Sequence, residues 1–320
     1  MTDGEFAFIA RRLQPLAAGS PGALGLLDDA ALLDPPAGAQ LVLTKDAMVA
    51  GVHFLPDDPP AQVAQKLLRV NLSDLAAMGA APLGYLLALA RAKDTTEDWL
   101  AAFCDGLAAD QATFGIGLLG GDTVSTPGPL TLSLTALGEV PKGQALLRST
   151  ARPDDEIWVS GTFGDGALGL KVLLHELAVG EPARGQLIER YRLPQPRVAL
   201  GQALRGLASA ALDISDGLLA DLGHILDTSG VGATVRAAAL PLSPAARELP
   251  GARAAALTGG DDYELLFTVA AARRQEVAAL ARRQCLPLTW IGEIEAAPGL
   301  RVLDEAGAEI SIATAGWQHF

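Results

Sequence analysis

The sequence has little cysteine and no excess of positive charge. Its two cysteines, Cys104 and Cys285, lie far apart, and neither has a second Cys or a His at metal-binding spacing. A disulfide framework and a structural zinc site are therefore both disfavoured, and we expect two reduced core thiols. Lys plus Arg number 24 and Asp plus Glu number 37, which gives a net charge of −13. This balance argues against a nucleic-acid or membrane partner held by a basic patch.

Long apolar runs are also missing, although the mean hydropathy is positive. The longest charge-free runs, residues 75–90 and 123–138, have about 16 residues each and contain Gly and Pro. A membrane-spanning helix needs roughly 18–20 apolar residues, so we expect neither run to span a membrane. Asp3 and Glu5 do not resemble the basic start of a signal peptide. We therefore expect a cytoplasmic protein.

The chain does contain enough apolar material for a large core, since half of its 320 residues are hydrophobic. Apolar spacing predicts helices at residues 5–17, 60–78, 96–114, 166–179, 200–207, 216–228 and 273–283. Short apolar runs predict strands at residues 40–46, 83–90, 116–119, 130–137, 157–160, 210–214, 263–269 and 288–294. A Pro-containing linker at 148–155 separates the two halves. The pattern predicts an α/β (α+β) chain with two domains, residues 1–147 and 148–320.

Aspartates recur where apolar runs end, and we expect a turn at each of these points. They are Asp28 and Asp29, Asp46, Asp122, Asp213 and Asp216, and Asp261 and Asp262. Asp74 lies inside an apolar helix, on the same face as Asn71. A single Asp at a turn is ordinary, but carboxylates among apolar residues need a partner. Oxygen-only ligands favour Mg²⁺ or Mn²⁺, and neighbouring glycines let backbone N–H groups approach phosphate. The set predicts metal–nucleotide chemistry.

Familiar nucleotide motifs are mostly absent. No Gly is followed by Lys, so there is no phosphate-binding loop of the G-x-x-x-x-G-K-[ST] type. Two G-x-G-x-x-G matches occur. Gly115–Gly120 lies between a helix and an Asp, the wrong context, and Gly164–Gly169 favours a tight helix start over a dinucleotide site. No Ser-His-Asp arrangement stands out.

Two further residues each have two interpretations. His53 lies in a Gly-containing loop seven residues beyond Asp46, where it either faces a ligand or serves the fold. Trp317, near the C-terminus, either closes the core or contacts a ligand.

These motifs together resemble the thiamine-monophosphate kinases. That family belongs to a superfamily with aminoimidazole ribonucleotide synthetase, selenophosphate synthetase and a hydrogenase-maturation protein. The similarity covers nearly the whole chain. It is carried by segments 4–6, 28–30, 46–54, 70–79, 120–123, 213–218, 259–265 and 319–320. The segment around Asp74 and the Asp213/Asp216 pair are typical of the superfamily, whereas the His53 loop, 259–265 and the Trp317 tail indicate the thiamine family.

The resemblance implies a two-domain aminoimidazole ribonucleotide synthetase-like fold and a homodimer joined through N-terminal mixed sheets. It implies that ATP and thiamine monophosphate give ADP and thiamine diphosphate, with several Mg²⁺ ions. The family's metal positions correspond to Asp29, Thr44, Lys45, Asp46, Asp74, Asp122, Asp213 and Asp216. Its ATP contacts correspond to Gly121, Asp122, Arg148 and Ser215, and its substrate contacts to His53, Asp261 and Trp317.

This chemistry agrees with the residues available. A phosphate monoester has a second pKa of about 6, so the attacking group is mostly dianionic at neutral pH and needs no general base. The obstacle is repulsion between two anions, which carboxylate-held Mg²⁺ and Arg148 would reduce. Two alternatives remain, namely another ATP-dependent synthetase of the superfamily (amidine-ring or selenophosphate type) and a non-catalytic nucleotide-binding regulator.

Two positions depart from the family pattern. Leu27 stands where Gly is common before the Asp pair, so that turn is expected to differ. Lys45 stands where Thr or Ser is common. Because side chains alternate along a strand, we expect Thr44 and Asp46 to share one face and Lys45 to point to the other. Any metal contact of Lys45 would then use its backbone carbonyl. The alternative is that Lys45 replaces one cation with its own charge.

Overall fold

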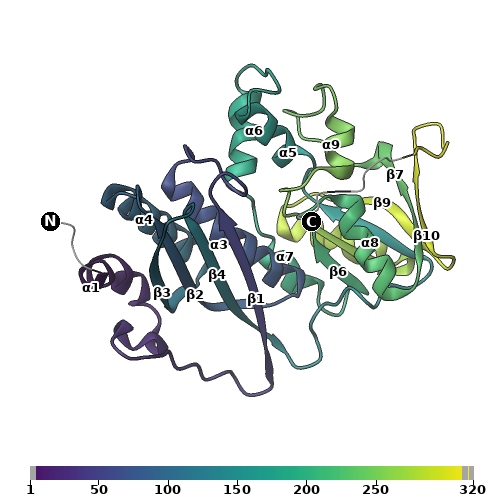
Figure 1. Ribbon diagram of the computed structural model, residues 1–320. Helices are drawn as coiled ribbons and strands as arrows, with labels where there is room; N and C mark the ends of the chain where they lie inside the picture. The colour runs from purple at the N-terminus through teal and green to yellow at the C-terminus, as the bar shows by residue number, and fades with distance from the viewer. Residues whose placement is uncertain (1–4, 312–315, 317–320) are drawn as a thin grey trace. The chain divides into compact units, whose positions relative to one another are not determined.

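The computed structural model describes residues 5–311 and residue 316. The chain divides into two compact units. The first contains residues up to Leu75 together with Ala80–Gly143, and the second contains Ala76–Gly79 and the residues from Gln144 onward. The chain has the expected α/β (α+β) composition, with one sheet in each unit (Figure 1).

The first unit is built on a four-stranded mixed sheet in the order β1-β4-β2-β3. Its strands are β1 (Ala39–Val49), β2 (Ala81–Ala92), β3 (Gly117–Thr126) and β4 (Thr131–Pro141). Its long helices are α3 (Pro60–Ala77) and α4 (Glu97–Phe114). A helical run precedes the sheet, with α1 (Glu5–Phe8), a π-helical turn (Ile9–Leu13), α2 (Gln14–Ala17) and a 3₁₀ segment (Pro21–Leu26). Figure 1 shows α3 and α4 on the same side of the sheet.

Helix ends in this unit follow local chemistry. The Thr96 hydroxyl accepts a hydrogen bond of 3.1 Å from the Trp99 N–H and so caps the start of α4. The helix ends at Gly115, which has a left-handed φ of 67° that glycine adopts without strain. These boundaries lie within a residue of the expected helix 96–114.

The alternation of burial along the strands identifies the covered face of the sheet. Tyr85, Leu87 and Leu89 of β2 are buried, whereas Leu86 between them is 39% exposed. The sheet is therefore covered mainly on one face, as expected for a mixed sheet with helices on one side.

Two strands run through points where we expected turns, and that expectation is wrong. β1 continues past Asp46 to Val49, and β3 continues through Asp122 to Thr126. Both are edge strands whose outer residues are partly exposed. In β3, mostly polar residues continue the pairing after the apolar run ends, whereas in β1 apolar residues follow Asp46.

The second unit contains a six-stranded sheet in the order β10-β7-β9-β5-β8-β6. Its strands are β5 (Asp155–Ser160), β6 (Ala210–Asp213), β7 (Gly232–Arg236), β8 (Leu265–Ala270), β9 (Leu288–Glu295) and β10 (Gly299–Leu303). Its helices are α5 (Asp165–Leu173), α6 (Ala183–Arg192), α7 (Val198–Leu204), α8 (Leu218–Ser229), α9 (Ala252–Thr258) and α10 (Arg274–Gln284). Short 3₁₀ segments lie at Ala237–Ala239 and Ala271–Arg273.

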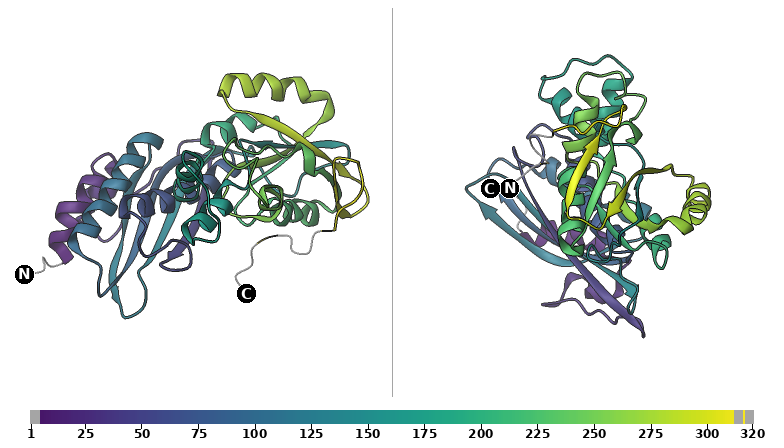
Figure 2. Two further views of the ribbon diagram at one scale, coloured as in Figure 1. Left: turned by 90° about the horizontal axis from the view of Figure 1, so that it is seen from above. Right: turned by 90° about the vertical axis from the view of Figure 1, so that its right-hand side faces the viewer.

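Both faces of this second sheet are covered. Residues of α8 and α9 pack in one apolar cluster with Ile157 and Leu266, and residues of α7 and α10 pack in another with Trp158 and Phe267. Figure 2 shows α10 and α8 on opposite sides of the sheet. Successive residues of β5 and β8 thus face the helices on opposite sides of the sheet. This explains why the sequences of these strands are continuously apolar and do not alternate.

Several elements of this unit were not expected from the sequence, namely α6, α9, β7 and β10. The expected helix 166–179 is also too long, because α5 ends at Leu173 and His175 adopts a left-handed φ of 60°. Gly164 begins α5 with a left-handed φ of 82°, which supports the tight helix start. Within the described ranges, no helix has the length and apolar character needed to cross a membrane.

Candidate active site

Thr44, Asp46 and Asp74 form a polar cluster between β1 and α3. The Thr44 hydroxyl donates a short hydrogen bond to Asp74 Oδ2. The backbone N–H of Asp46 donates to Asn71 Oδ1 at 3.2 Å, and the Asn71 amide in turn donates to the Leu67 carbonyl. The expected pairing of Asn71 and Asp74 on one helix face is therefore present, with β1 as its partner.

The charge of this cluster fits a divalent cation. Burial, together with the neighbouring Asp74 carboxylate, raises the pKa of Asp46 to about 7. Two carboxylates so close together cannot both ionise cheaply unless positive charge lies between them. The hydroxyl and carboxylate oxygens of the cluster are the hard donors that Mg²⁺ prefers.

Lys45 lies on the opposite face of β1 from this cluster. Lys45 is exposed, whereas Thr44 and Asp46 on either side of it are partly buried. The strand alternation expected from the sequence is thus confirmed at this position. The Lys45 side chain points away from the Asp46–Asp74 pair.

The His53 loop directly follows β1 and is held by backbone contacts. The Val49 N–H donates to His53 Nδ1 at 3.1 Å, and Lys66 Nζ donates to the His53 carbonyl at 3.4 Å. Asp58 accepts the Leu55 N–H at 2.8 Å. Because Nδ1 accepts a hydrogen bond, the neutral imidazole carries its proton on Nε2.

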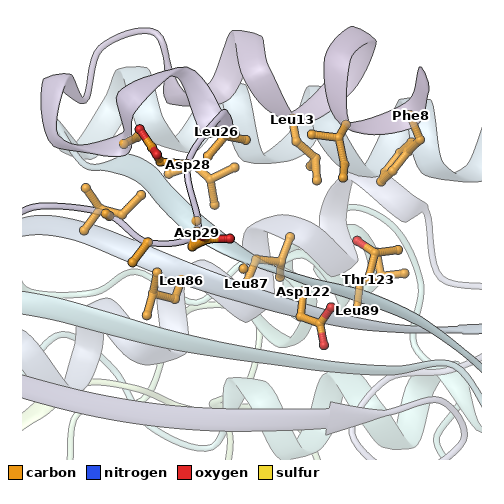
Figure 3. Close-up of a pocket in the computed structure, with 18 of the residues that line it drawn as sticks. Phe8, Leu13, Leu26, Asp28, Asp29, Leu86, Leu87, Leu89, Asp122 and Thr123 are labelled. Atoms are coloured by element: carbon orange, nitrogen blue, oxygen red, sulfur yellow. The ribbon is translucent and has the colours of Figure 1, made fainter. Parts of the chain in front are cut away.

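A cavity of about 520 Å³ lies in the first unit beside β3. Figure 3 shows Phe8, Leu13 and Leu26 from the N-terminal segments on one side and Leu86, Leu87 and Leu89 of β2 on the other. Three carboxylates and a Gly-Gly pair line the same cavity: Asp28, Asp29, Asp122, Gly120 and Gly121. The cavity is therefore apolar with an acidic, glycine-containing portion.

The turn before Asp28 differs from the family pattern in an unexpected way. Leu27 has an ordinary φ of −107° and is 80% exposed, so its backbone does not require glycine. The left-handed positions are instead Leu24, Gly25 and Leu26, with φ of 52°, 67° and 57°. Non-glycine residues adopt this conformation at a cost, which places the strain on the segment that lines the cavity.

The two acidic groups of the first unit lie at opposite edges of its sheet. Asp46 is on β1 and Asp122 is on β3, with β4 and β2 between them. Along the strands they are nearly level, because Asp122 pairs with Ala88, Ala88 with Ser133 and Ser133 with Ala47. Three strand spacings separate them by about 14 Å. Across the described residues, no three carboxylate, imidazole or thiol side chains converge as a metal site.

In the second unit, the loops after β6 and before β8 are joined by backbone hydrogen bonds. The β6–β8 ladder ends at the Asp213–Leu265 pair. Beyond it, Ile214 N–H donates to the Glu264 carbonyl at 2.9 Å, and Tyr263 N–H donates to the Ile214 carbonyl at 2.8 Å. Asp261 N–H then donates to the Ser215 carbonyl at 2.9 Å. The expected ATP and substrate loops of this unit are thus one paired structure.

The substrate loop has an unusual backbone that its neighbours hold in place. Asp261 and Tyr263 both have left-handed φ, 65° and 51°. The buried Asp262 carboxylate accepts the Gly164 N–H at 2.8 Å, and burial raises the pKa of Asp262. The fully buried Glu264 carboxylate pairs with Arg190 and Arg197. These contacts hold the backbone that follows Asp261.

Sequence reasoning missed Asp221 and Glu264 as partners of this site, and it counted Asp262 among the metal–nucleotide carboxylates, whereas the Asp262 carboxylate accepts the Gly164 N–H. Asp221 accepts three backbone N–H groups of the turn after β6. Burial raises the pKa of Asp221 to about 6, against those hydrogen bonds, which lower it. For Asp221, the signal in the sequence is an acidic residue within a mostly apolar helix, as it was for Asp74.

The remaining expected site residues are Arg148 and Trp317. Arg148 is exposed, and its carbonyl accepts a hydrogen bond from the Ser229 hydroxyl at 2.9 Å. Trp317 lies outside the described residues. Gly316, which precedes it, packs so closely on the Asp216 carbonyl that a Cβ there would come within 2.7 Å of that oxygen. The cysteines differ from expectation, since Cys104 is buried but Cys285 is exposed at the end of α10.

Comparison with known proteins gives a consistent result. The chain matches the model of the AIR synthase related protein N-terminal domain over residues 27–140 and that of the C-terminal domain over residues 152–305. It is 45% identical to the thiamine-monophosphate kinase of Caulobacter vibrioides over 98% of this chain and 90% of that protein.

Solved structures agree with this match. The crystal structure of thiamine-monophosphate kinase from Stenotrophomonas maltophilia K279a is 47% identical, with a TM-score of 0.85 over 94% of this chain and 97% of that chain. A structure of AaThiL complexed with AMPPCP and TMP is 31% identical, with a TM-score of 0.78 over 93% and 97%. The chain therefore belongs to the thiamine-monophosphate kinase family of AIR synthase related proteins.

Proposed function

We propose that this protein transfers the γ-phosphoryl group of ATP directly to thiamine monophosphate, giving ADP and thiamine diphosphate. The observation that carries the proposal is the Asp46–Asp74 pair beside Thr44, a cluster of oxygen ligands that suits a divalent cation. It occurs in a chain that is 45% identical to a thiamine-monophosphate kinase. The complex of the related AaThiL with AMPPCP and TMP supports the same substrate pair. We propose that the reaction takes place in the cytoplasm.

The metal ions would be held by carboxylates. We assign Asp29, Thr44, Asp46, Asp74, Asp122, Asp213 and Asp216 as Mg²⁺ ligands, with Lys45 contributing only its backbone carbonyl. When bound, Mg²⁺ neutralises phosphate oxygens and aligns the reacting groups. The Arg148 guanidinium adds positive charge toward the ATP phosphates. No side chain needs to remove a proton, because the attacking phosphate is already ionised.

The cavity beside β3 suits the nucleoside part of ATP. Its walls are leucine and phenylalanine side chains, and its volume of about 520 Å³ is within the range of small-molecule sites. Gly121 and Asp122 line the same cavity, so the phosphates would leave the apolar part beside them. Backbone N–H groups at glycines can approach phosphate closely.

Three residues would recognise thiamine monophosphate. His53 would donate from Nε2, because its Nδ1 accepts the Val49 N–H. Asp261 would face the permanent thiazolium charge with its carboxylate. Trp317 would offer an aromatic face, and cation–π contact is worth about 0.5–2 kcal/mol.

We propose a homodimer, in which Asp46 of one copy would lie close to Asp122 of the other. If β3 of one copy lies beside β1 of another, the two edge strands bring these carboxylates together across the interface. The exposed side chains of Leu43 (63%) and Val124 (49%), one on each edge strand, agree with a covered surface in the assembly.

The decisive experiment mixes the purified protein with ATP, Mg²⁺ and thiamine monophosphate. We expect ADP and thiamine diphosphate in equal amounts. ADP release that does not need thiamine monophosphate would indicate a different superfamily synthetase. Nucleotide binding without any ADP release would indicate a regulator. Either outcome would overturn the proposal.

A further inference from the structure

Asp221 makes an unusual contact with the turn that carries Ser215 and Asp216. Three consecutive backbone N–H groups, those of Ser215, Asp216 and Gly217, donate to its Oδ2 at 3.0, 3.0 and 3.1 Å. Asp221 lies in the first turn of α8 and is only 3% exposed. An ordinary helix cap accepts one or two such groups. Here the whole turn folds around a single carboxylate oxygen.

Consecutive backbone N–H groups at a helix start form a concave site that normally attracts an anion such as phosphate. In this protein, the chain's own Asp221 already occupies that position. The three N–H groups point inward and are not available to a ligand. This turn therefore differs from glycine-rich loops that hold phosphate with their backbone.

On the side of the turn away from Asp221, the polar atoms are oxygens. The Ile214 and Ser215 carbonyls accept hydrogen bonds from Tyr263 and Asp261. The Ser215 hydroxyl and the Asp216 carboxylate remain, and both residues are partly exposed. A surface of this kind repels a bare phosphate and attracts a cation.

We propose that Asp221 is a positioning residue that turns the backbone N–H groups of residues 215–217 inward, so that this turn meets the nucleotide only through bound cations and the Ser215 hydroxyl. The proposal rests on the proposed function, because it assumes that the turn faces a metal–nucleotide complex. It assigns a role to a side chain that touches neither substrate nor metal.

The test compares Asp221→Asn with Asp227→Asn, a matched change at an exposed position of the same helix. The dissociation constant for AMPPCP with Mn²⁺ is measured by calorimetry, and KM for thiamine monophosphate is measured in parallel. Loss of a charged acceptor for three N–H groups should weaken Mn²⁺–AMPPCP binding about tenfold or more. KM for thiamine monophosphate should change less than about threefold. Asp227→Asn should match the wild type in both.

A folded Asp221→Asn protein that binds Mn²⁺–AMPPCP as the wild type does would overturn the proposal. So would equal losses for both ligands, which indicate a general structural role. A second measurement uses the wild-type protein and does not depend on any variant folding. In a sample that contains EDTA, tripolyphosphate should leave the amide resonances of residues 215–217 unshifted. In a separate sample without EDTA and without Mn²⁺, the Mg²⁺ complex of AMPPCP should shift them.

Shifts of those three amides by tripolyphosphate alone would contradict the inward-facing turn. These readouts use binding and resonance positions. They can fail while ADP release with thiamine monophosphate succeeds, and the reverse also holds, so the two proposals are tested separately.

Discussion

The backbone N–H of Asp261 donates a hydrogen bond of 2.9 Å to the carbonyl oxygen of Ser215. Asp261 is proposed to contact thiamine monophosphate, and the family resemblance implies an ATP contact at Ser215. The contact joins the two loops of the second unit directly.

A methyl group at Gly260 should separate the paired loops. A Cβ there would lie 2.5 Å from the Ser215 carbonyl oxygen, which is backbone and cannot rotate away. We expect Gly260→Ala to lower kcat/KM about 10- to 100-fold, because small displacements of positioned groups are costly. Gly223→Ala is the control, since nothing lies within 4 Å of its Cβ position. That change should keep activity and stabilise α8 by about 0.5–1 kcal/mol. Steady-state kinetics and thermal melts of both variants provide the measurement, and equal activity would refute the steric argument.

Asp74→Asn should separate catalysis from stability. Removing one of two adjacent carboxylates relieves their repulsion, so the metal-free variant should melt at the same temperature as the wild type or higher. Turnover should fall by orders of magnitude, and Mg²⁺ should raise the melting temperature of the wild type but not that of the variant. Asp213→Asn should lower turnover similarly. Wild-type turnover in EDTA, or in both variants, would be inconsistent with the metal assignment.

Mixing two inactive variants should restore activity if the site is shared between copies. Asp74→Asn alters the cluster between α3 and the edge strand β1, whereas Asp122→Asn alters the opposite edge strand β3, so a mixed dimer has one site with both original carboxylates. Random reassociation should recover about a quarter of wild-type activity. The measurement is ADP release after co-refolding, with each variant refolded alone as the control. Continued inactivity of a mixture shown to contain mixed dimers would mean that each site uses one chain.

Lys45→Thr should leave the metal dependence unchanged. The Lys45 side chain is on the face of β1 opposite the Asp46–Asp74 pair, so its ammonium does not replace a cation there. The Mg²⁺ concentration for half-maximal activity should stay within about twofold of the wild-type value. A steeper Mg²⁺ dependence in the variant would instead show that Lys45 substitutes for one metal ion.

Trp317→Ala should change KM for only one of the two substrates. Loss of an aromatic face beside the thiazolium ring should raise KM for thiamine monophosphate about 3- to 30-fold and leave KM for ATP nearly unchanged. Kinetics with each substrate varied in turn separate the two effects. Equal changes in both constants would assign Trp317 to the core.

The parts of the site that depend on local pattern were predictable. Asp74 and Asn71 share a helix face because of their spacing, and Thr44 and Asp46 share a strand face because of alternation. The sequence could not reveal that the strand carrying Asp46 and the strand carrying Asp122 are opposite edges of one sheet. That relationship depends on strand order, which is set by long-range packing and not by local propensity.

Partner residues were harder to predict than the residues they hold. Asp221 is recognisable only once three N–H groups are seen to converge on it, and Glu264 only once Arg190 and Arg197 are seen beside it. The strands at Asp46 and Asp122 were expected to end too early, because polar residues interrupt the apolar run on these edge strands while their backbone pairing continues.

The pairing of the two loops has an evolutionary consequence. Its hydrogen bonds follow a fixed register from the Asp213–Leu265 pair outward, so one residue added or removed between Gly259 and Glu264 would displace every later partner. Such a loop can accept amino-acid substitutions, but its length must stay the same. The exposed stretch around Glu176–Gly180 carries no such register. In descendants of this protein, insertions should therefore accumulate in that stretch and be excluded from the paired loops.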